Sequence, residues 1–545
     1  MSDLFIRWAQ SLCSKRTALL AATFVLFVVL LVLQNSGVFP LQTEDFIFFV
    51  LLTFLIVLYR PAWGFLFFVS LVPLEIVNVA PETLGVALRP YQLVGALTFV
   101  ALIFRYLSKS LGFRFVRLTW IDIPVAFMII GGFLSASVAA QGGAAFKQSV
   151  VVFSFGVLYA LSRQFLRNAA DTKAIVPFVL GSGAIVSMYA LWQNVRFAFG
   201  QESFEVMAGR ANATFAEPDW LGMYLVALVS LVYALLFSLG SHGKATSKEA
   251  GNNHKEMAVS ERFRQFLLYG LLFFFFVALI LTVARSAWLG VAVASILFIV
   301  AAISRGFPTI AEWCWKEGLL QGIAVAAIGL IALGTVLVFH LTTFQLFNRA
   351  QSVTSGWQKI TVSCNEKVVL PEHVPTAADI EAYGCRHINL EERESEQSQG
   401  RFIQEVYRDD PNVNIRKRIY GTVFGLIREN PFFGIGWGNV SAYLGKDERG
   451  AGLNASNVFL EVWLGSGLIG FIAFCALWFG ALYSVLCVWF RSEKSSREAL
   501  VALFVVLSGA GLTVFNLFNS GLLLGFVWIW LATAAIGAKP LRKNI

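Results

Sequence analysis

Long apolar runs recur along almost the whole chain, and they constrain the fold more than any other feature. Each crossing of a lipid bilayer needs about 20 mostly apolar residues, and runs of that length are separated here by short polar segments. Of the 545 residues, 57% are hydrophobic and 14% are charged. A soluble protein carries roughly a quarter charged residues. The sequence therefore predicts an all-α protein, a polytopic bundle of about 12–14 transmembrane helices.

The predicted helices lie near 17–34, 45–59, 62–79, 90–106, 121–139, 146–163, 174–193, 217–239, 266–283, 286–303, 319–340, 460–489, 499–518 and 521–537. The first follows Arg7, Lys15 and Arg16 and has no small-residue cleavage site after it, so we expect an anchor rather than a cleavable signal. One boundary stays open, because Arg285 interrupts the apolar block 266–303. We favour a tight helical hairpin with this arginine buried against protein, and one long bent helix is the alternative.

Basic residues are spread unevenly over the segments between these runs. With the amino terminus in the cytoplasm, the inner clusters are Arg105/Lys109/Arg114/Arg117, Arg163/Arg167/Lys173, Lys244/Lys248/Lys255/Arg262/Arg264, Arg491/Lys494/Arg497 and Lys539/Arg542/Lys543. The short outer loops hold Arg89, Lys147, Arg196, Arg210 and Arg285. Cytoplasmic loops are rich in Lys and Arg, so we expect both termini in the cytoplasm. The net charge of +9 then reflects topology and implies no nucleic-acid partner.

One long polar segment divides the chain into helices at 1–340, an outer loop at 341–456 and helices at 457–545. We expect this loop to be partly helical. It holds Cys364 and Cys385, and because the outer compartment is oxidising we expect a disulfide. Closing a ring of about 20 residues would stabilise the loop by roughly 3 kcal/mol. Two free thiols are the alternative.

The end of the loop has a helical apolar spacing after Arg416-Lys417-Arg418, which predicts an amphipathic helix that stops at Asn430-Pro431. A glycine-rich turn, 434–439, follows; it either approaches a ligand or is a flexible connector. Glu392 and Glu396 would share a helix face and could bind a metal, but a solvated acidic helix is the simpler interpretation. The histidines show no zinc-ligand spacing, so we predict no metal site.

Two outer arginines, Arg210 and Arg285, are candidates for phosphate binding. A guanidinium can bind two phosphate oxygens at once through two parallel N–H groups, and it stays charged in an apolar setting. Two of them at the outer interface could hold a pyrophosphate whose lipid tail lies between helices. The alternative is an arginine that extends from the membrane interface into water without a ligand.

Four segments resemble one family, the bacterial O-antigen ligase and O-antigen polymerase superfamily. They are Arg210 to Gly222, Thr282 to Gly290, Arg418 to Gly438 and Ser456 to Gly470, and the resemblance covers roughly residues 130–490. Their order and the long loop between the second and fourth make the match fairly specific. Two positions depart from the family pattern: Asp219 stands where asparagine is usual, and Ser456 stands where ligases carry histidine.

The resemblance implies an inner-membrane glycosyltransferase that moves a glycan from undecaprenyl pyrophosphate to an acceptor at the periplasmic face, with no cofactor and no metal. Arg210 and Arg285 would bind the pyrophosphate, and Arg418 would bind phosphate or acceptor sugar. Ser456 cannot act as a base unaided near neutral pH, so Glu461 or Asp219 is the candidate base.

The missing histidine favours a polymerase, or an exopolysaccharide or protein-glycan transferase, over a lipid A-core ligase. The acceptor stays open between lipid A-core, a growing polymer and a protein. The competing hypothesis is a transporter or flippase for lipid-linked sugars, or a non-catalytic assembly protein. A transporter would place charged groups near the bilayer midplane, whereas the marked residues here gather at one face.

Overall fold

The computed structural model covers residues 1–545 and describes residues 15–207, 209–245, 253–304, 313–342, 346, 357–374, 378–388, 393–409, 411–445 and 452–537. A helix lies at each predicted span: α2 Lys15–Asn35, α3 Thr43–Tyr59, α4 Pro61–Leu71, α5 Pro90–Leu107, α6 Ile123–Val138, α7 Gly142–Phe165, α8 Ala169–Ala198, α9 Pro218–Ala245, α10 Asn253–Leu281, α11 Arg285–Ser304, α12 Trp315–Val338, α18 Val458–Arg491, α19 Arg497–Asn516 and α20 Gly525–Gly537.

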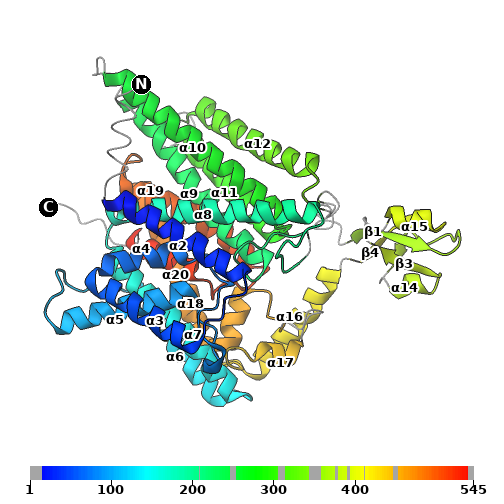
Figure 1. The fold of residues 1–545 in the computed structure, drawn as a ribbon, viewed down its shortest axis with the longest axis horizontal. Coiled ribbons are helices and arrows are strands. Elements are labelled where there is room, and N and C mark those ends of the chain that lie inside the picture. Colours follow the sequence, from blue (N-terminus) through cyan, green and yellow to red (C-terminus); the bar gives the residue numbers. More distant parts are fainter. Residues whose placement is uncertain are drawn as a thin grey trace.

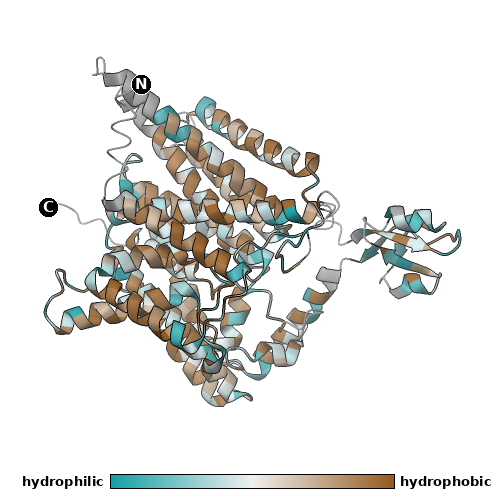
Figure 2. Cartoon of the chain, viewed as in Figure 1, coloured by the Kyte–Doolittle hydropathy of each residue, from teal (hydrophilic) through white to brown (hydrophobic). Residues whose placement is uncertain are grey.

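Within the described residues, ten helices are long and apolar enough to cross a membrane, and α4, α6 and α20 are shorter apolar helices. The prediction of a polytopic helical bundle is therefore confirmed. Figure 2 shows that the helices are mainly apolar over their length. The core is made where α6 packs on α18 and where α11 and α9 pack on α19. Trp478 and Trp528 are among the largest fully buried side chains.

The predicted span 62–79 is helical only to Leu71, where α4 ends. Pro73 disfavours helix in the residue before it, and the non-helical backbone that follows is buried. Its polar groups find partners inside the protein. The amide of Glu75 donates to the carbonyl of Thr214 (3.0 Å), and Nε of Arg89 donates to the carbonyl of Glu75 (2.9 Å). A 3-10 turn, η1 Glu82–Leu84, then leads towards α5.

The apolar block 266–303 is two helices, because α10 ends at Leu281 and α11 begins at Arg285. Val283 between them has a positive φ of 53°, which breaks the helical path. The two helices then take different neighbours: α10 packs mainly on α8, α9 and α12, and α11 mainly on α9, α12 and α19. The predicted break is correct. The predicted tight hairpin is wrong, since the two helices hardly touch each other along their length.

The long loop contains a four-stranded sheet that the sequence analysis did not predict, in the order β2-β4-β1-β3. Its strands are β1 Trp357–Cys364, β2 His373–Val374, β3 Cys385–Ile388 and β4 Phe402–Asp409. β1 pairs antiparallel with β3 and β4, and β2 pairs parallel with β4. Figure 1 shows the sheet standing apart from the transmembrane helices. The loop also has the helices α14 Ala378–Glu381, α15 Arg393–Ser398, α16 Pro411–Glu429 and α17 Val440–Leu444.

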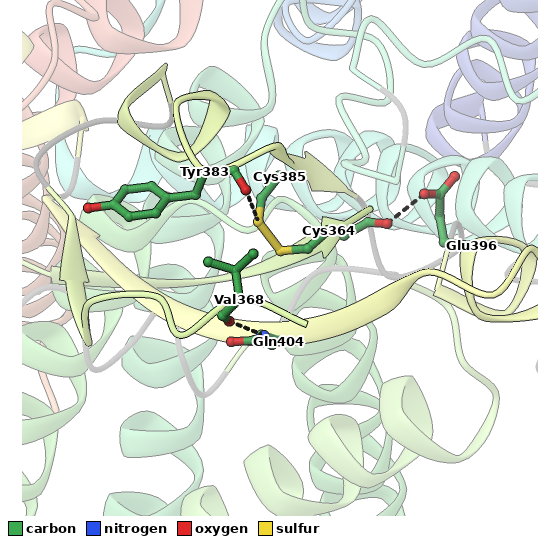
Figure 3. Close-up of a disulfide and its surroundings, with 7 residues drawn as sticks. Cys364, Val368, Tyr383, Cys385, Glu396 and Gln404 are labelled. Carbon is green, nitrogen blue, oxygen red and sulfur yellow. Dashed lines mark hydrogen bonds between the residues drawn. A yellow bond between two sulfur atoms is a disulfide. The ribbon is translucent and has the colours of Figure 1, made fainter. Parts of the chain in front are cut away.

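A disulfide joins Cys364 on β1 to Cys385 on β3, and both residues are buried (Figure 3). Beside it the carboxylate of Glu396 on α15 accepts hydrogen bonds from Oγ of Ser363 (2.6 Å) and from Arg386 (2.7 Å). The Ser363 hydroxyl and the Arg386 guanidinium lower the pKa of Glu396. Glu396 therefore anchors α15 on the sheet. Glu392, its partner in the weighed metal pair, lies outside the described residues.

Candidate functional site

The segment before α9 is docked on the break between α10 and α11, and it carries Arg210 there. The amide of Ala211 donates to the carbonyl of Leu281 (3.1 Å). Nε of Arg210 donates to the carbonyl of Thr282 (3.0 Å), and its side chain is only 10% exposed. Arg285 is the first residue of α11, three positions after Thr282, and is half-buried. Both predicted pyrophosphate ligands therefore belong to one junction.

Asp219, in the first turn of α9, is an ion-pair partner of this arginine. Its Oδ2 lies 3.6 Å from a terminal guanidinium nitrogen of Arg210, and the Asp219 side chain is 31% exposed. On the other side, Nη1 of Arg210 contacts the sulfur of Met207 (3.4 Å). These contacts and the Thr282 carbonyl orient the guanidinium, which still has further N–H groups for an anion. The position of Asp219 suits a residue that orients Arg210 more than a catalytic base.

A second carboxylate, Glu205, shapes the loop that carries Arg210. Its Oε2 accepts hydrogen bonds from the amide of Gly209 (2.9 Å) and from the hydroxyl of Ser203 (3.0 Å). Burial raises the pKa of Glu205 above its usual range. Glu205 thus holds the turn that ends at Arg210.

The connection between α19 and α20 joins three of the motif segments. Nδ2 of Asn519 donates to the hydroxyl of Ser286, the neighbour of Arg285 (2.7 Å). The carbonyl of Leu517 accepts from Nδ2 of Asn457 (3.2 Å) and from the hydroxyl of Tyr420 (3.3 Å). Residues 517–519 therefore link the start of α11, the start of α18 and the amphipathic helix α16.

At the start of α18, Ser456 and Glu461 lie within one capped turn. Asn457 is the N-cap, and its Oδ1 accepts from the amides of Phe459 (2.9 Å) and Leu460 (3.2 Å). Ser456 has a positive φ of 49°, which turns the chain sharply into the helix. Oε2 of Glu461 accepts from the amide of Ala455 (2.7 Å), directly before Ser456. The fold thus brings these two predicted residues together.

Arg418 does not share this arrangement. It is exposed, and it is two positions from Tyr420 on α16, a spacing that places side chains on different sides of a helix. Arg416 is four positions from Tyr420, so these two share a face. Tyr420 donates to the carbonyl of Ser456 (3.3 Å), and the guanidinium carbon of Arg416 lies 5.5 Å from the ring centre of Phe518. Arg416, and not Arg418, is therefore the arginine of α16 that faces the candidate site.

The glycine-rich turn packs against the break in α18 and fixes the position of the first turns of that helix. Gly467 has φ 66°, and α18 is broken there. A Cβ on Gly467 would lie 2.2 Å from the carbonyl oxygen of Phe432, so only glycine allows this approach. Across the break, the amide of Leu468 donates to Phe432 (2.9 Å) and that of Ile435 donates to Leu464 (2.8 Å). The turn is therefore fixed to α18 by backbone hydrogen bonds and is not a flexible connector.

Three helices begin around this junction, α9, α11 and α18, whereas the first amide of α20 donates to the buried carboxylate of Glu75 (3.3 Å). The contacts above connect the segments before α9, α11 and α18, so these three amino-terminal ends lie close together. Helix N-termini carry partial positive charge, which favours anions, although at α18 the amides of Phe459 and Leu460 already donate to the Asn457 side chain. Together with Arg210 and Arg285 they form a region suited to a phosphate group. Within the described residues, no three His, Cys, Asp or Glu side chains are grouped as metal ligands.

The sequence analysis missed Tyr420, Arg416 and the connection 517–519 as parts of this region. Tyr420 and Arg416 had a usable signal, since both lie on one face of the predicted amphipathic helix. The connection had none, because its role rests on backbone carbonyls and one asparagine that no local pattern marks.

Comparison with known proteins agrees with this geometry. Residues 270–475 match a family model described as O-antigen ligase. The match includes Arg285, α16, the glycine-rich turn and the start of α18, and it begins after the Arg210 segment. No curated protein matches the chain. Residues 270–475 are therefore similar to the O-antigen ligase family, which supports the resemblance to the O-antigen ligase and polymerase superfamily.

Proposed function

We propose that this protein is a glycosyltransferase of surface polysaccharide assembly in a bacterial inner membrane. It takes a glycan from undecaprenyl pyrophosphate and transfers it to an acceptor at the periplasmic face. Both termini lie in the cytoplasm and the loop 341–456 lies in the periplasm. The observation that carries the proposal is the junction where Arg210 and Arg285 meet the amino-terminal ends of α9, α11 and α18.

The chemistry explains why this junction matters. The bond between the sugar carbon and the pyrophosphate oxygen breaks, and negative charge grows on the pyrophosphate as it leaves. Positioned guanidinium groups and helix N-termini stabilise this developing charge more than the charge of the bound donor. Arg210 is held by the Thr282 carbonyl and Asp219, so little reorganisation is needed when the bond breaks.

The acceptor hydroxyl must lose a proton as its oxygen bonds to the sugar carbon. Glu461 is the carboxylate at the start of α18, with one oxygen held by the Ala455 amide and the other left to accept that proton. Ser456 is next to this amide and would orient the acceptor hydroxyl. Arg416 and Tyr420 would contact the acceptor or the phosphate from α16, in place of Arg418.

Purified protein in detergent, incubated with lipid-linked oligosaccharide and an oligosaccharide acceptor, tests the proposal. The expected result is new glycan products of higher mass together with free undecaprenyl pyrophosphate. Arg196→Ala is the matched control, since Arg196 is an outer arginine whose contacts are with Trp192, Phe204 and the carbonyl of Glu202 and not with Arg210 or Arg285. Movement of the lipid-linked donor across vesicles without any new product would identify a carrier and contradict the proposal.

A further inference from the structure

The described part of the chain forms an open, mainly apolar cavity of about 890 Å³ that the proposed reaction does not use. Its walls come from α8, α9, α10, α19 and α20, with the end of α4. Tyr224 and Leu239 both line it on α9, and the helix rises about 22 Å between them. That length is about two-thirds of the ~30 Å hydrocarbon core of a bilayer. The cavity is thus long, and its lining is mainly apolar.

Charged groups gather at one end of the cavity. Lys173 lies in the first turns of α8, Arg497 is the first residue of α19, and Arg264 lies in the first half of α10. All three are exposed, and Glu261 is the one acidic residue in the lining. This end therefore carries a net positive charge. It lies at the ends of α8 and α19 that our orientation assigns to the cytoplasm.

The other end of the cavity reaches the base of the candidate site. The ring of Tyr224 lies 5.4 Å from that of Phe215 and 5.3 Å from that of Phe526, measured between ring centres. Phe215 belongs to the same docked segment as Arg210, and Phe526 is in the first turn of α20. A ligand that fills the cavity would therefore pack against the layer that supports the arginine segment.

We propose that this cavity binds an anionic glycerophospholipid of the inner leaflet. One acyl chain occupies the apolar length of the cavity, and the phosphate lies among Lys173, Arg264 and Arg497. A zwitterionic lipid would bring a positively charged ammonium group to an end that has three basic residues and a single carboxylate, so the anionic headgroup is preferred. The cavity and its charges carry this proposal without the glycosyl transfer reaction, and only the choice of the inner leaflet rests on the proposed orientation.

Native mass spectrometry of the purified full chain tests this, with phosphatidylglycerol and phosphatidylcholine as the probes. Basic side chains near anionic lipid each contribute about fivefold in affinity. The double variant Arg264→Gln/Arg497→Gln should therefore bind phosphatidylglycerol roughly 25-fold more weakly. The control Arg262→Gln/Arg491→Gln changes exposed arginines near the same helix ends that do not line the cavity, and it should bind like the wild type.

A second variant fills the cavity and leaves its charges intact. Ala234 on α9 is buried and lines the cavity, so Ala234→Trp should abolish retention of phosphatidylglycerol. If that variant fails to fold, the double variant Arg264→Gln/Arg497→Gln still tests the proposal, because both side chains are exposed and their replacement should not disturb folding. Equal loss in the two arginine pairs, equal retention of phosphatidylcholine, or full binding by a folded Ala234→Trp protein would overturn the proposal.

Discussion

Arg210 is held mainly by backbone and by one carboxylate of its own neighbourhood. Its Nε is fixed by the Thr282 carbonyl, and Asp219 lies 3.6 Å from a terminal nitrogen. Such a side chain is placed before any ligand arrives, which is what stabilisation of a charged leaving group requires. Arg285 differs, because it stands at the first position of α11, where the N–H groups of the helix end add to its charge.

Arg210→Ala should lower the rate of glycan transfer about 100-fold or more, because removal of one preorganised charge donor typically costs 10²–10³ in rate. Arg210→Lys should recover only part of the activity, since an ammonium offers a point charge instead of two aligned N–H groups. The rate of product formation by purified protein measures both effects, with Arg196→Ala as control. Wild-type activity in Arg210→Ala would remove this residue from the mechanism.

Single residues were predictable from the sequence where their type is rare in its surroundings. Arg210 and Arg285 stand out because the outer loops are poor in basic residues, and the structure places both at one junction. The sequence motif alone does not fix which side of α16 faces the bundle, so it cannot distinguish Arg416 from Arg418. That choice depends on Tyr420 docking against the carbonyls of Ser456 and Leu517, a long-range contact with no local signature.

At the scale of elements, α16 lies along the site with a defined orientation. Arg416→Gln should lower glycan transfer more than Arg418→Gln does, because only Arg416 shares the face of Tyr420. The two variants remove the same charge from the same helix, two positions apart, so they control for each other. Comparing kcat/KM for the acceptor measures the difference, and a larger loss in Arg418→Gln would reverse the assignment.

The glycine-rich turn and the break in α18 form a second element with a sharp requirement. Gly467→Ala puts a Cβ where the carbonyl oxygen of Phe432 already lies and forces a positive φ on alanine. We expect a loss of about 1–3 kcal/mol in stability, seen as a lower unfolding temperature in detergent. Gly334→Ala on α12, where a Cβ meets nothing within 4 Å, should leave that temperature unchanged or raise it. Equal unfolding temperatures for the two variants would refute the close contact between Gly467 and Phe432.

Elements were predicted well where hydrophobicity decides them and poorly where it does not. Every predicted span has a helix, but α4 stops early. Pro73 disfavours helix in the residue before it, and Glu75 then forms hydrogen bonds with Thr214 and Tyr91 in place of helical ones. In the loop, β1 alternates buried Ile360 and Val362 with polar residues, a strand pattern. The sequence analysis overlooked it because the run is short and lies in a polar segment. Strand pairing between β1 and β4 is also a long-range event that no local spacing reveals.

Within the described residues, Arg210, Arg285 and three helix starts gather at one end of the molecule, and Lys173, Arg264 and Arg497 lie toward the other. Our orientation puts the loop 341–456 in the periplasm and the connection between α5 and α6 in the cytoplasm. In a chain with Cys13, Cys314, Cys475 and Cys487 replaced by serine, a membrane-impermeant thiol reagent should label Lys417→Cys in intact spheroplasts. Leu118→Cys, equally on the surface, should react only after lysis. The opposite pattern would invert the topology and place the site in the cytoplasm.

In the proposed mechanism, Arg210 and Arg285 bind the diphosphate of the lipid-linked donor. The most direct measurement is the dissociation constant of undecaprenyl pyrophosphate for the purified protein and its variants. Arg285→Ala and Arg210→Ala should each weaken binding about tenfold or more, since a charge-assisted hydrogen bond contributes about 1.5–3 kcal/mol. Arg196→Ala should bind like the wild type. Unchanged affinity in both junction variants would contradict the account.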